Sequence, residues 1–439
     1  MKKNIISLAA LLIVSATFVA CSSDDNIIEE QPVQPTEQVY TMTVNAQKGG
    51  DAADSRATTR ALSLSGSTLN ATWTAGDAVE VWTSDGTTTK YGTLTAETSG
   101  ASTKLKGTLS SLPSNGQTLL LKYLSPAYAT QDGTLTGSAT SIDRVCDYAT
   151  ATVTATVVGS SVTATDANFV NQQAIVKFTL KNKADDEALS VNKLFVTAGG
   201  TTCEVTPSGA TSELYVAVPA IASGRVTLTA LSGSTYYDYL KTGVTLAQSQ
   251  YYTISASLTE VKSISNAREA SLGRVVAADR MMYASVESAT NAGTTALAVI
   301  ARMHAGIVHN DFTAIAVSDE SSKMNWNNAN NACNNKTPIG GATWQFPSVS
   351  LWEDMFWFNG GNQNSYTGLD ALITKTGGTA LDTEWYYWTS TDGTNNSDNK
   401  RNMLLNDSDG TIVFNNGSDK SSLLLVRAFL TFQGDYSLL

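Results

Sequence analysis

Short runs in which apolar and polar residues alternate fill the chain from Val39 to Leu258. Successive side chains of a β-strand point to opposite faces, so each run predicts a strand with one buried face. The runs lie at residues 40–44, 79–82, 119–123, 174–180, 214–218, 226–228 and 252–258, and turn residues separate them. No helical period interrupts the region. The pattern predicts two antiparallel β-sandwich domains, at residues 39–182 and 183–262, which meet at the polar stretch 182–187.

The composition suits strands and excludes several classes of function. Only 15% of the residues are charged, the formal net charge is −11, and the chain has two histidines, His304 and His309. Binding of nucleic-acid phosphates requires clustered Lys and Arg, so we expect no nucleic-acid partner. Two histidines rule out a His-rich metal site, and no motif indicates a bound cofactor.

The N-terminus has the features of a bacterial lipoprotein signal. Lys2 and Lys3 precede an apolar run at residues 5–20, which is too short to span a membrane and ends in the small residue Ala20. Residues 18–21, Phe-Val-Ala-Cys, resemble a lipobox, in which Cys21 is acylated and becomes the mature N-terminus. Residues 1–20 are therefore expected to be a signal peptide, and the alternative is an ordinary secretory signal cut nearby.

Residues 21–38 are expected to form a disordered acidic tether, because they show no apolar periodicity. The pair Asp24-Asp25 so close to Cys21 resembles the surface-export signal of Bacteroidetes lipoproteins. This resemblance implies a cell-surface protein of a Gram-negative bacterium, held in the outer membrane by its lipid.

Three further cysteines, Cys146, Cys203 and Cys333, have irregular spacing. An odd number at such spacing provides neither a disulfide framework nor a zinc site. We expect each of them to be a small buried hydrophobic residue.

Three segments carry a resemblance to a known family. Residues 72–81 (TWTAGDAVEV), 169–178 (FVNQQAIVKF) and 251–258 (YYTISASL) are similar, in this order, to strands of the fimbrillin-like (type V pilin) family. The resemblance covers residues 39–262. It implies transthyretin-like pilin domains and a role as a fimbrial subunit.

The family also implies a maturation step. Its subunits travel as lipoproteins, and a protease then cuts after an arginine in the loop that follows the first strand. Here the first strand is expected at residues 39–46, Arg60 before Ala61 best matches the cleavage position, and Arg56 is the second choice. Loss of that strand would let a strand of another pilin subunit fill the groove by β-strand addition. The alternative is two solvated arginines in an ordinary loop.

The character of the sequence changes after Leu258. Residues 262–269 resemble a linker, and helical spacing of apolar residues follows at 326–333 and 347–356. Strands are then expected at residues 386–390, 403–405, 411–414 and 423–432. These elements predict a C-terminal α+β domain at residues 268–433.

This domain resembles the C-type-lectin-like domains appended to many Bacteroidetes surface proteins. The resemblance is carried by Trp326, Ala329, Cys333, Gly341, Trp344, Pro347, Ser348, by residues 387–390 and by residues 426–428. The calcium-binding loop of sugar-binding members is absent, so we expect no metal. Trp357, Trp385 and Tyr386 are the aromatic residues most expected to be exposed and to contact a ligand.

Three functions remain open at this stage. The first is a fimbrial subunit at the pilus tip, since the last strand is expected to belong to the C-terminal domain and only residues 433–439 are left to donate. The second is a permanently anchored lipoprotein that binds a glycan or protein without polymerising. The third is an enzyme, which no catalytic motif supports, and we therefore expect no enzymatic activity.

Overall fold

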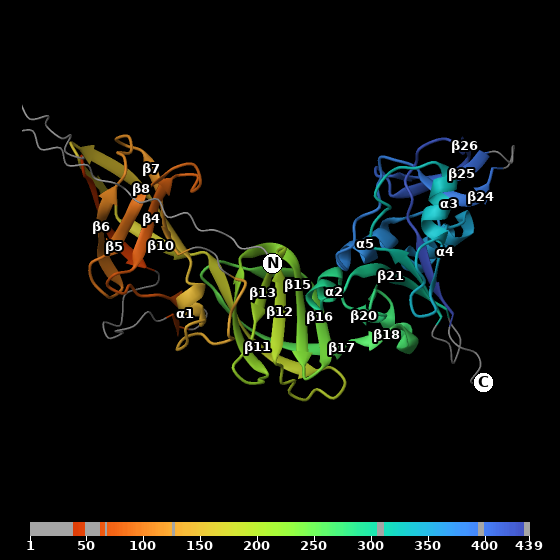
Figure 1. Ribbon diagram of the computed structural model, residues 1–439, viewed down its shortest axis with the longest axis horizontal. Coiled ribbons are helices and arrows are strands. Elements are labelled where there is room, and N and C mark those ends of the chain that lie inside the picture. The colour runs from red at the N-terminus through yellow and green to blue at the C-terminus, as the bar shows by residue number, and fades with distance from the viewer. Residues whose placement is uncertain are drawn as a thin grey trace, which may run out of the picture. The chain divides into compact units, whose positions relative to one another are not determined.

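The alternating runs up to residue 258 all lie in strands, as predicted (Figure 1). The computed structural model describes residues 38–48, 62–65, 68–124, 128–304, 311–393 and 399–433. The predicted signal peptide, the tether as far as residue 37, and the candidate residues Cys21, Arg56, Arg60 and Ala61 lie outside the described residues.

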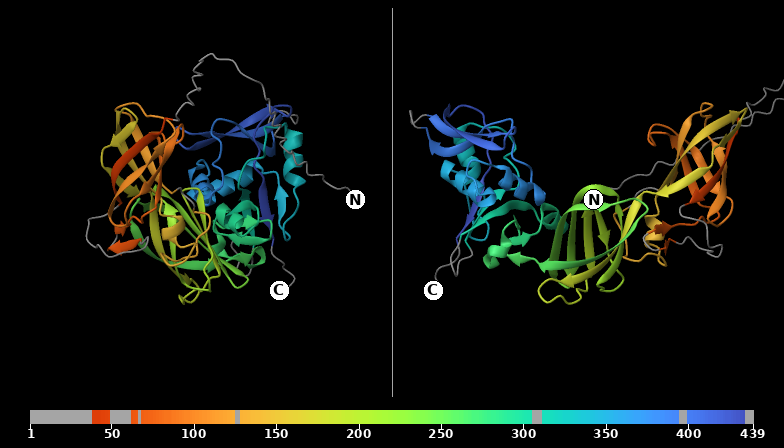
Figure 2. Two further views of the ribbon diagram at one scale, coloured as in Figure 1. Left: turned by 60° about the vertical axis from the view of Figure 1, so that its left-hand side comes forward. Right: turned by 180° about the vertical axis from the view of Figure 1, so that it is seen from behind.

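The first sheet closes on itself. Its strand order is β10-β1-β6-β5-β4-β7-β8-β9, and further pairings join β10 to β8 and β1 to β9. The strands, orange to yellow in Figures 1 and 2, are β1 (Tyr40–Lys48), β4 (Ala78–Thr83), β5 (Lys90–Ala96), β6 (Ser102–Leu109), β7 (Thr118–Tyr123), β8 (Ala149–Val158), β9 (Ser161–Ala164) and β10 (Ala167–Asn171). A short hairpin, β2 (Ser63–Ser65) and β3 (Thr68–Asn70), follows β1 in the chain.

The second sheet begins earlier than the sequence predicted. Its order is β13-β12-β15-β16-β17-β11-β14. Its strands are β11 (Gln173–Asn182), β12 (Lys193–Ala198), β13 (Thr201–Val205), β14 (Glu213–Pro219), β15 (Ile221–Ser232), β16 (Thr235–Leu246) and β17 (Tyr251–Glu260). Residues 173–182, expected in the first domain, form β11, which pairs with β14 and β17. β10 and β11 are separated by Gln172 alone, and this junction carries no cluster of turn residues that would mark a boundary.

The two sheets are mostly antiparallel, but three strand pairs are parallel. β1 runs parallel to β9 and to β10, and β11 runs parallel to β17. The expectation of antiparallel domains is therefore wrong for these pairs. The alternation of apolar and polar residues indicates on which face of the sheet each side chain lies. It does not indicate whether the neighbouring strand runs parallel or antiparallel.

The segment between β7 and β8 packs on the second sheet. It contains a short helix, α1 (Ile142–Val145), where no helix was expected. The Gln131 side chain takes the place of a strand at the edge of β14, since its Nε2 donates to Ala217 O (2.9 Å) and its Oε1 accepts from Ala217 N (2.8 Å). An open strand edge is a template for unwanted pairing, and this segment covers part of it.

The C-terminal region is an α+β structure. Its larger sheet has the order β18-β20-β19-β21-β22-β27-β23, and β24-β25-β26 form a smaller one. The strands are β18 (Lys262–Ser263), β19 (Val275–Ala277), β20 (Met281–Tyr283), β21 (Ala296–Met303), β22 (Phe312–Ala316), β23 (Thr343–Gln345), β24 (Tyr387–Asp392), β25 (Asn399–Asn406), β26 (Thr411–Asp419) and β27 (Phe429–Phe432). The helices are α2 (Val286–Asn291), α3 (Trp326–Asn334), α4 (Val349–Gly360) and α5 (Thr367–Lys375), with 3-10 turns η1 (Ile264–Asn266) and η2 (Glu269–Ser271).

Two expectations for this region need correction. Residues 262–269 are no linker, because β18 pairs with β20 and η1 buries Ile264. The last strand covers only Phe429–Phe432, and residues 424 and 425 make single bridges instead. Between these parts the backbone is held by single hydrogen bonds, from Glu320 N to Val426 O and from Ala316 N to Ala428 O (2.9 Å each).

Helix α4 shows why the helical prediction for residues 347–356 held. Ser348 Oγ accepts from Leu351 N (3.2 Å) and caps the first turn. Trp352, Met355 and Phe356 are buried on one face. Gly361 ends the helix with a φ of 67°, a left-handed conformation that favours glycine. No helix among the described residues is long and apolar enough to cross a membrane.

Cys146, Cys203 and Cys333 are buried, as predicted. Burial raises the pKa of the Cys146, Cys203 and Cys333 thiols to about 12. Because the thiolate is the reactive form, only ~10⁻⁴ of each thiol is ionised at pH 8. We expect iodoacetamide to leave all three unmodified in the native protein and to modify all three in guanidinium, with positions assigned by peptide mass spectrometry. Alkylation of one of them in the native protein at the rate of free cysteine would contradict this.

Candidate functional site

Strand β1 has neighbours on both edges along its length. On one edge it pairs antiparallel with β6, from Tyr40 opposite Leu109 to Gln47 opposite Ser102. On the other edge it runs parallel first to β9 and then to β10. The strand is therefore an integral member of a closed sheet, and its loss would expose two edges at once.

The inward side chains of β1 fill the core of the first sheet. Met42, Val44 and Ala46 are buried, whereas Thr41, Asn45 and Gln47 on the other face are exposed. Burial of side chains as large as Met and Val stabilises a fold by roughly 1.5–3 kcal/mol each. Both faces of β1 thus follow the alternation that predicted the strand, and the strand extends two residues beyond the predicted range, to Lys48.

The fourth inward position of β1 is charged. Lys48 is 1% exposed, and its Nζ lies 2.6 Å from Asp147 Oδ2. The same ammonium lies 3.4 Å from the ring centroid of Tyr123 and 5.1 Å from that of Trp73. Trp73 packs edge-on against Tyr123 and Phe169, at centroid distances of 5.5 and 5.1 Å. Asp147, Tyr123 and Trp73 together form what we call the cation socket.

Sequence reasoning missed this socket. The predicted strand ends at Ala46, and one further step of the alternation places Lys48 on the buried face. Nothing in the sequence pairs Lys48 with Asp147, which follows it by 99 positions. A lysine in phase with the apolar residues of a strand was the available signal.

A glycine opposite Met42 sets how closely the strands approach. Gly107 of β6 faces Met42 across the ladder. A Cβ atom at this position would lie 2.2 Å from Thr93 O of β5, a contact that the backbone could not accept. Glycine at this position therefore permits β5, β6 and β1 to lie side by side.

The aromatic residues predicted to be accessible are exposed. Trp357 on α4 is 60% exposed, and Trp385 and Tyr386, just before β24, are 45% and 37% exposed. Lys323 Nζ lies over the ring of Trp385. Among the described residues, no ring contact joins Trp357 to the other two, so the structure does not gather the three into one site. Contact with a ligand stays a prediction.

A buried polar network organises the core of the C-terminal region. Arg427 is 1% exposed, and its Nε donates to Asp319 Oδ1 (2.5 Å) while its Nη1 donates to Thr379 O (2.8 Å). Tyr387 OH donates to Asp319 Oδ2 (2.9 Å). Burial raises the pKa of Asp319, and the guanidinium and the phenol oppose this change. Every strong donor of the network has a partner, which indicates a structural role.

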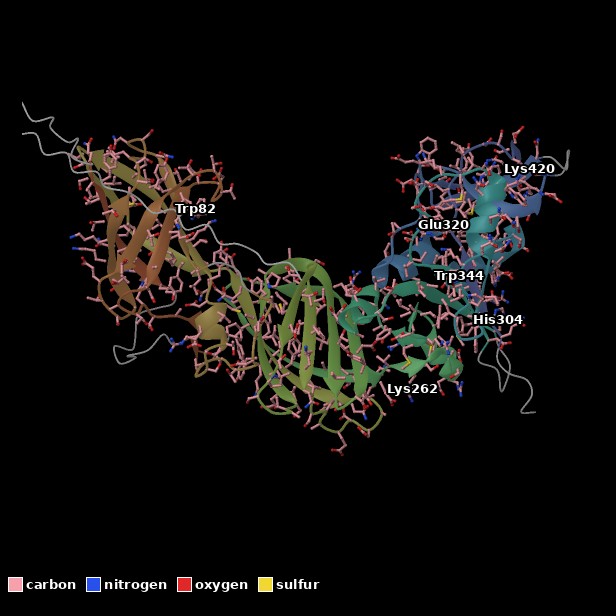
Figure 3. All side chains as sticks on the ribbon, viewed as in Figure 1. Trp82, Lys262, His304, Glu320, Trp344 and Lys420 are labelled. Carbon is pink, nitrogen blue, oxygen red and sulfur yellow. The ribbon has the colours of Figure 1, made fainter. Side chains whose placement is uncertain are left out.

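Residues that could act in catalysis are scattered. His304 donates to or accepts from Thr313 Oγ1 (2.9 Å), and burial lowers the pKa of its imidazole. Glu320 pairs with Lys336 (2.8 Å), whose ammonium also lies 5.2 Å from the ring centroid of Trp344. His304 and Glu320 are labelled at separate places in Figure 3. In the part of the chain that the structure describes, no three His, Cys, Asp or Glu side chains are grouped to hold a metal ion.

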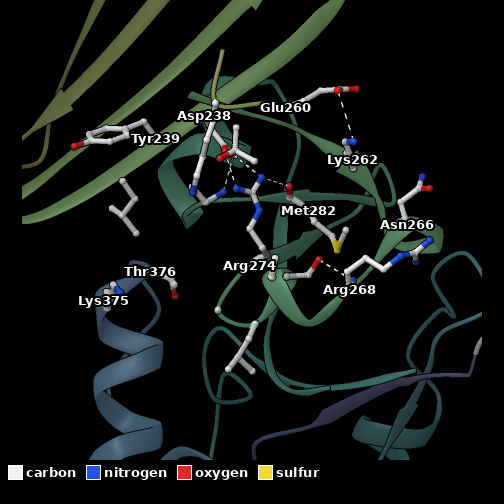
Figure 4. Close-up of a pocket in the computed structure, with 18 of the residues that line it drawn as sticks. Asp238, Tyr239, Glu260, Lys262, Asn266, Arg268, Arg274, Met282, Lys375 and Thr376 are labelled. Carbon is white, nitrogen blue, oxygen red and sulfur yellow. Dashed lines mark hydrogen bonds and ion pairs between the residues drawn. The ribbon is translucent and has the colours of Figure 1, made fainter. Parts of the chain in front are cut away.

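A pocket of about 750 Å³ lies beside strands β16 and β17 and the first part of the C-terminal region (Figure 4). At its centre, Arg274 binds both oxygens of Asp238 (2.8 and 3.0 Å) and donates to Met282 O (2.6 Å). Asp238 also accepts from Ala284 N (2.6 Å), and burial raises the pKa of its carboxyl against the effect of Arg274. These groups are committed to one another and join β16 to the C-terminal sheet, so we assign them no ligand.

Comparisons with known proteins give the following picture. No family model matches the chain, and no curated protein matches it. A fimbrial assembly protein from Parabacteroides distasonis is 13% identical with a TM-score of 0.27, over 51% of this chain and 94% of its own. A fimbrial protein from Bacteroides ovatus is 10% identical with a TM-score of 0.23, over 82% of this chain and 95% of its own. The C-terminally truncated tip fimbrial protein Mfa3 from Porphyromonas gingivalis is 9% identical with a TM-score of 0.25, over 49% and 94%. Because these sequence identities and TM-scores are low, the function of this chain is argued from its own residues.

Proposed function

We propose that the protein is a surface-exposed fimbrial subunit whose first strand is removed during maturation, so that a strand from another subunit takes its place. In this proposal Cys21 carries the lipid during export to the outer membrane, and cleavage follows Arg60, or Arg56 as second choice. The single observation that supports it best is the position of β1, which pairs on both edges and contributes buried side chains to the core of a closed sheet. Departure of such a strand creates a groove that only another strand can fill.

The last strand favours a place at the pilus tip. β27 pairs with β22 on one edge and with β23 on the other. Phe429 and Leu430 are fully buried, so this strand is part of the core of the C-terminal region. A strand that is paired on both edges in this way is not available for donation to another subunit. The C-terminal region would then be the adhesive domain, of C-type-lectin-like type, and its exposed aromatic residues would contact a glycan or protein receptor.

The mature N-terminus tests this function. We expect protein released from the cell surface to begin at Ala61, or at Ala57 if Arg56 is the site, as measured by mass spectrometry. Replacement of both arginines by Ala should leave the protein uncleaved and absent from fimbriae, while Lys90→Ala, at an exposed position of β5, should change neither result. A surface protein that begins at acylated Cys21 and retains residues 39–60 would instead identify a permanently anchored lipoprotein.

A further inference from the structure

We propose that the groove of β1 selects its occupant by charge, accepting a pilin strand with a Lys or Arg side chain at the position of Lys48. The inference rests on the proposed function, because it concerns the strand that replaces β1. It goes further in naming the chemistry that such a strand must carry.

The cation socket remains in the protein when β1 leaves. Trp73 precedes β4, Tyr123 ends β7, and Asp147 lies between α1 and β8, so all three belong to the part after Arg60. The socket is therefore a permanent feature of one end of the groove. It combines a carboxylate with two aromatic faces, which is an arrangement that binds an ammonium or guanidinium group.

The rest of the groove sets an apolar pattern before this position. Met42, Val44 and Ala46 occupy the three inward positions that precede Lys48, and all are buried. A strand that matches β1 must therefore present apolar, apolar, small and cationic side chains at every second residue. Because Ala46 pairs with Ala167 and Lys48 with Phe169 of β10, the register that brings the cation to the socket also fixes the three apolar positions.

An incoming strand without the cationic side chain would bind the groove with a less favourable free energy. The Asp147 side chain is 4% exposed. If the incoming strand had a neutral residue at the position of Lys48, this buried carboxylate would lose its contact with an ammonium group. An acidic residue would add like-charge repulsion. The free-energy cost of an unmatched buried charge discriminates between strands more strongly than apolar contacts do, because apolar pockets accept many different side chains.

Peptide binding to the full chain tests the inference. Residues 57–60 are replaced by the recognition sequence of a protease that cuts nowhere else in the chain, because an arginine-specific protease would also reach the exposed Arg144, Arg268 and Arg280. The full chain is cut at this sequence and incubated with fluorescent peptides that have the sequence of residues 38–48. Displacement of the cut N-terminal segment is followed by anisotropy and native mass spectrometry. We expect the Lys48→Met peptide to bind at least about tenfold more weakly than the unchanged peptide, and the Lys48→Glu peptide more weakly still. A Gln47→Met peptide, altered at an exposed position, should bind within about threefold of the unchanged one.

The outcomes separate the two proposals. Equal binding of the unchanged and Lys48→Met peptides would overturn selection by charge and leave the groove itself in place. Retention of β1 against every peptide would overturn both. In an Asp147→Asn protein the preference for Lys over Met should shrink to less than about threefold. If that variant does not fold, the peptide series on the unchanged protein decides the question alone.

Discussion

Replacement of Lys48 by Met in the intact chain is expected to lower the free energy of unfolding of the first sheet by about 3–5 kcal/mol. Methionine matches the length of the lysine stem but supplies no charge, so Asp147 loses the ammonium that lies 2.6 Å from it in a buried environment. The contacts of the ammonium with Tyr123 and Trp73 are lost as well. Amide hydrogen exchange of peptides from β6 and β8 measures the change, because it reports on this sheet separately from the rest of the chain.

An exposed ion pair in the same sheet provides the control. Lys90 Nζ lies 2.5 Å from Glu80 Oε1, but the two side chains are 40% and 37% exposed. Solvent screening makes such pairs worth little, and Lys90→Met should change protection by no more than about 0.5 kcal/mol. The double variant Lys48→Met, Asp147→Leu should recover most of the lost stability, since apolar side chains then replace both members of the buried ion pair. If Lys48→Met and Lys90→Met had equal effects, the socket would contribute nothing to the stability of β1.

The strands could be predicted from the sequence where one face is buried and the other is exposed. β1 and β7 are such strands, and their inward residues alternate. Strands β19 and β22 were missed because nearly every residue in them is buried. A strand covered on both faces is continuously apolar and has no alternation to detect.

The candidate site depends on contacts between distant parts of the chain. Lys48 contacts Asp147 because β1 closes the sheet next to β10. The local periodicity of the sequence indicates neither this closure nor the parallel direction of the two strands. Helix α5 was missed for a similar reason, since its buried residues, Leu369 and Ile373, are too few to define a face by themselves. Local patterns therefore indicated the type of those elements that have a clear apolar face, while the assembly of the groove required the three-dimensional structure.

Replacement of Arg427 by Met should destabilise the C-terminal region by about 3–5 kcal/mol and leave the first sheet unchanged. The guanidinium donates to Asp319 and to two backbone oxygens, of Thr379 and Ala380, so its removal leaves a largely buried carboxylate and two carbonyls without these donors. Lys336→Met is the matched control, because Lys336 pairs with Glu320, the residue next to Asp319, and its side chain is 30% exposed. That control should cost less than about 1 kcal/mol. Hydrogen exchange in β24 and β27 distinguishes the two variants. If Arg427→Met lowered protection in β1 as much as in β27, the two regions would unfold as one cooperative unit, and the C-terminal region could not be an independently stable domain.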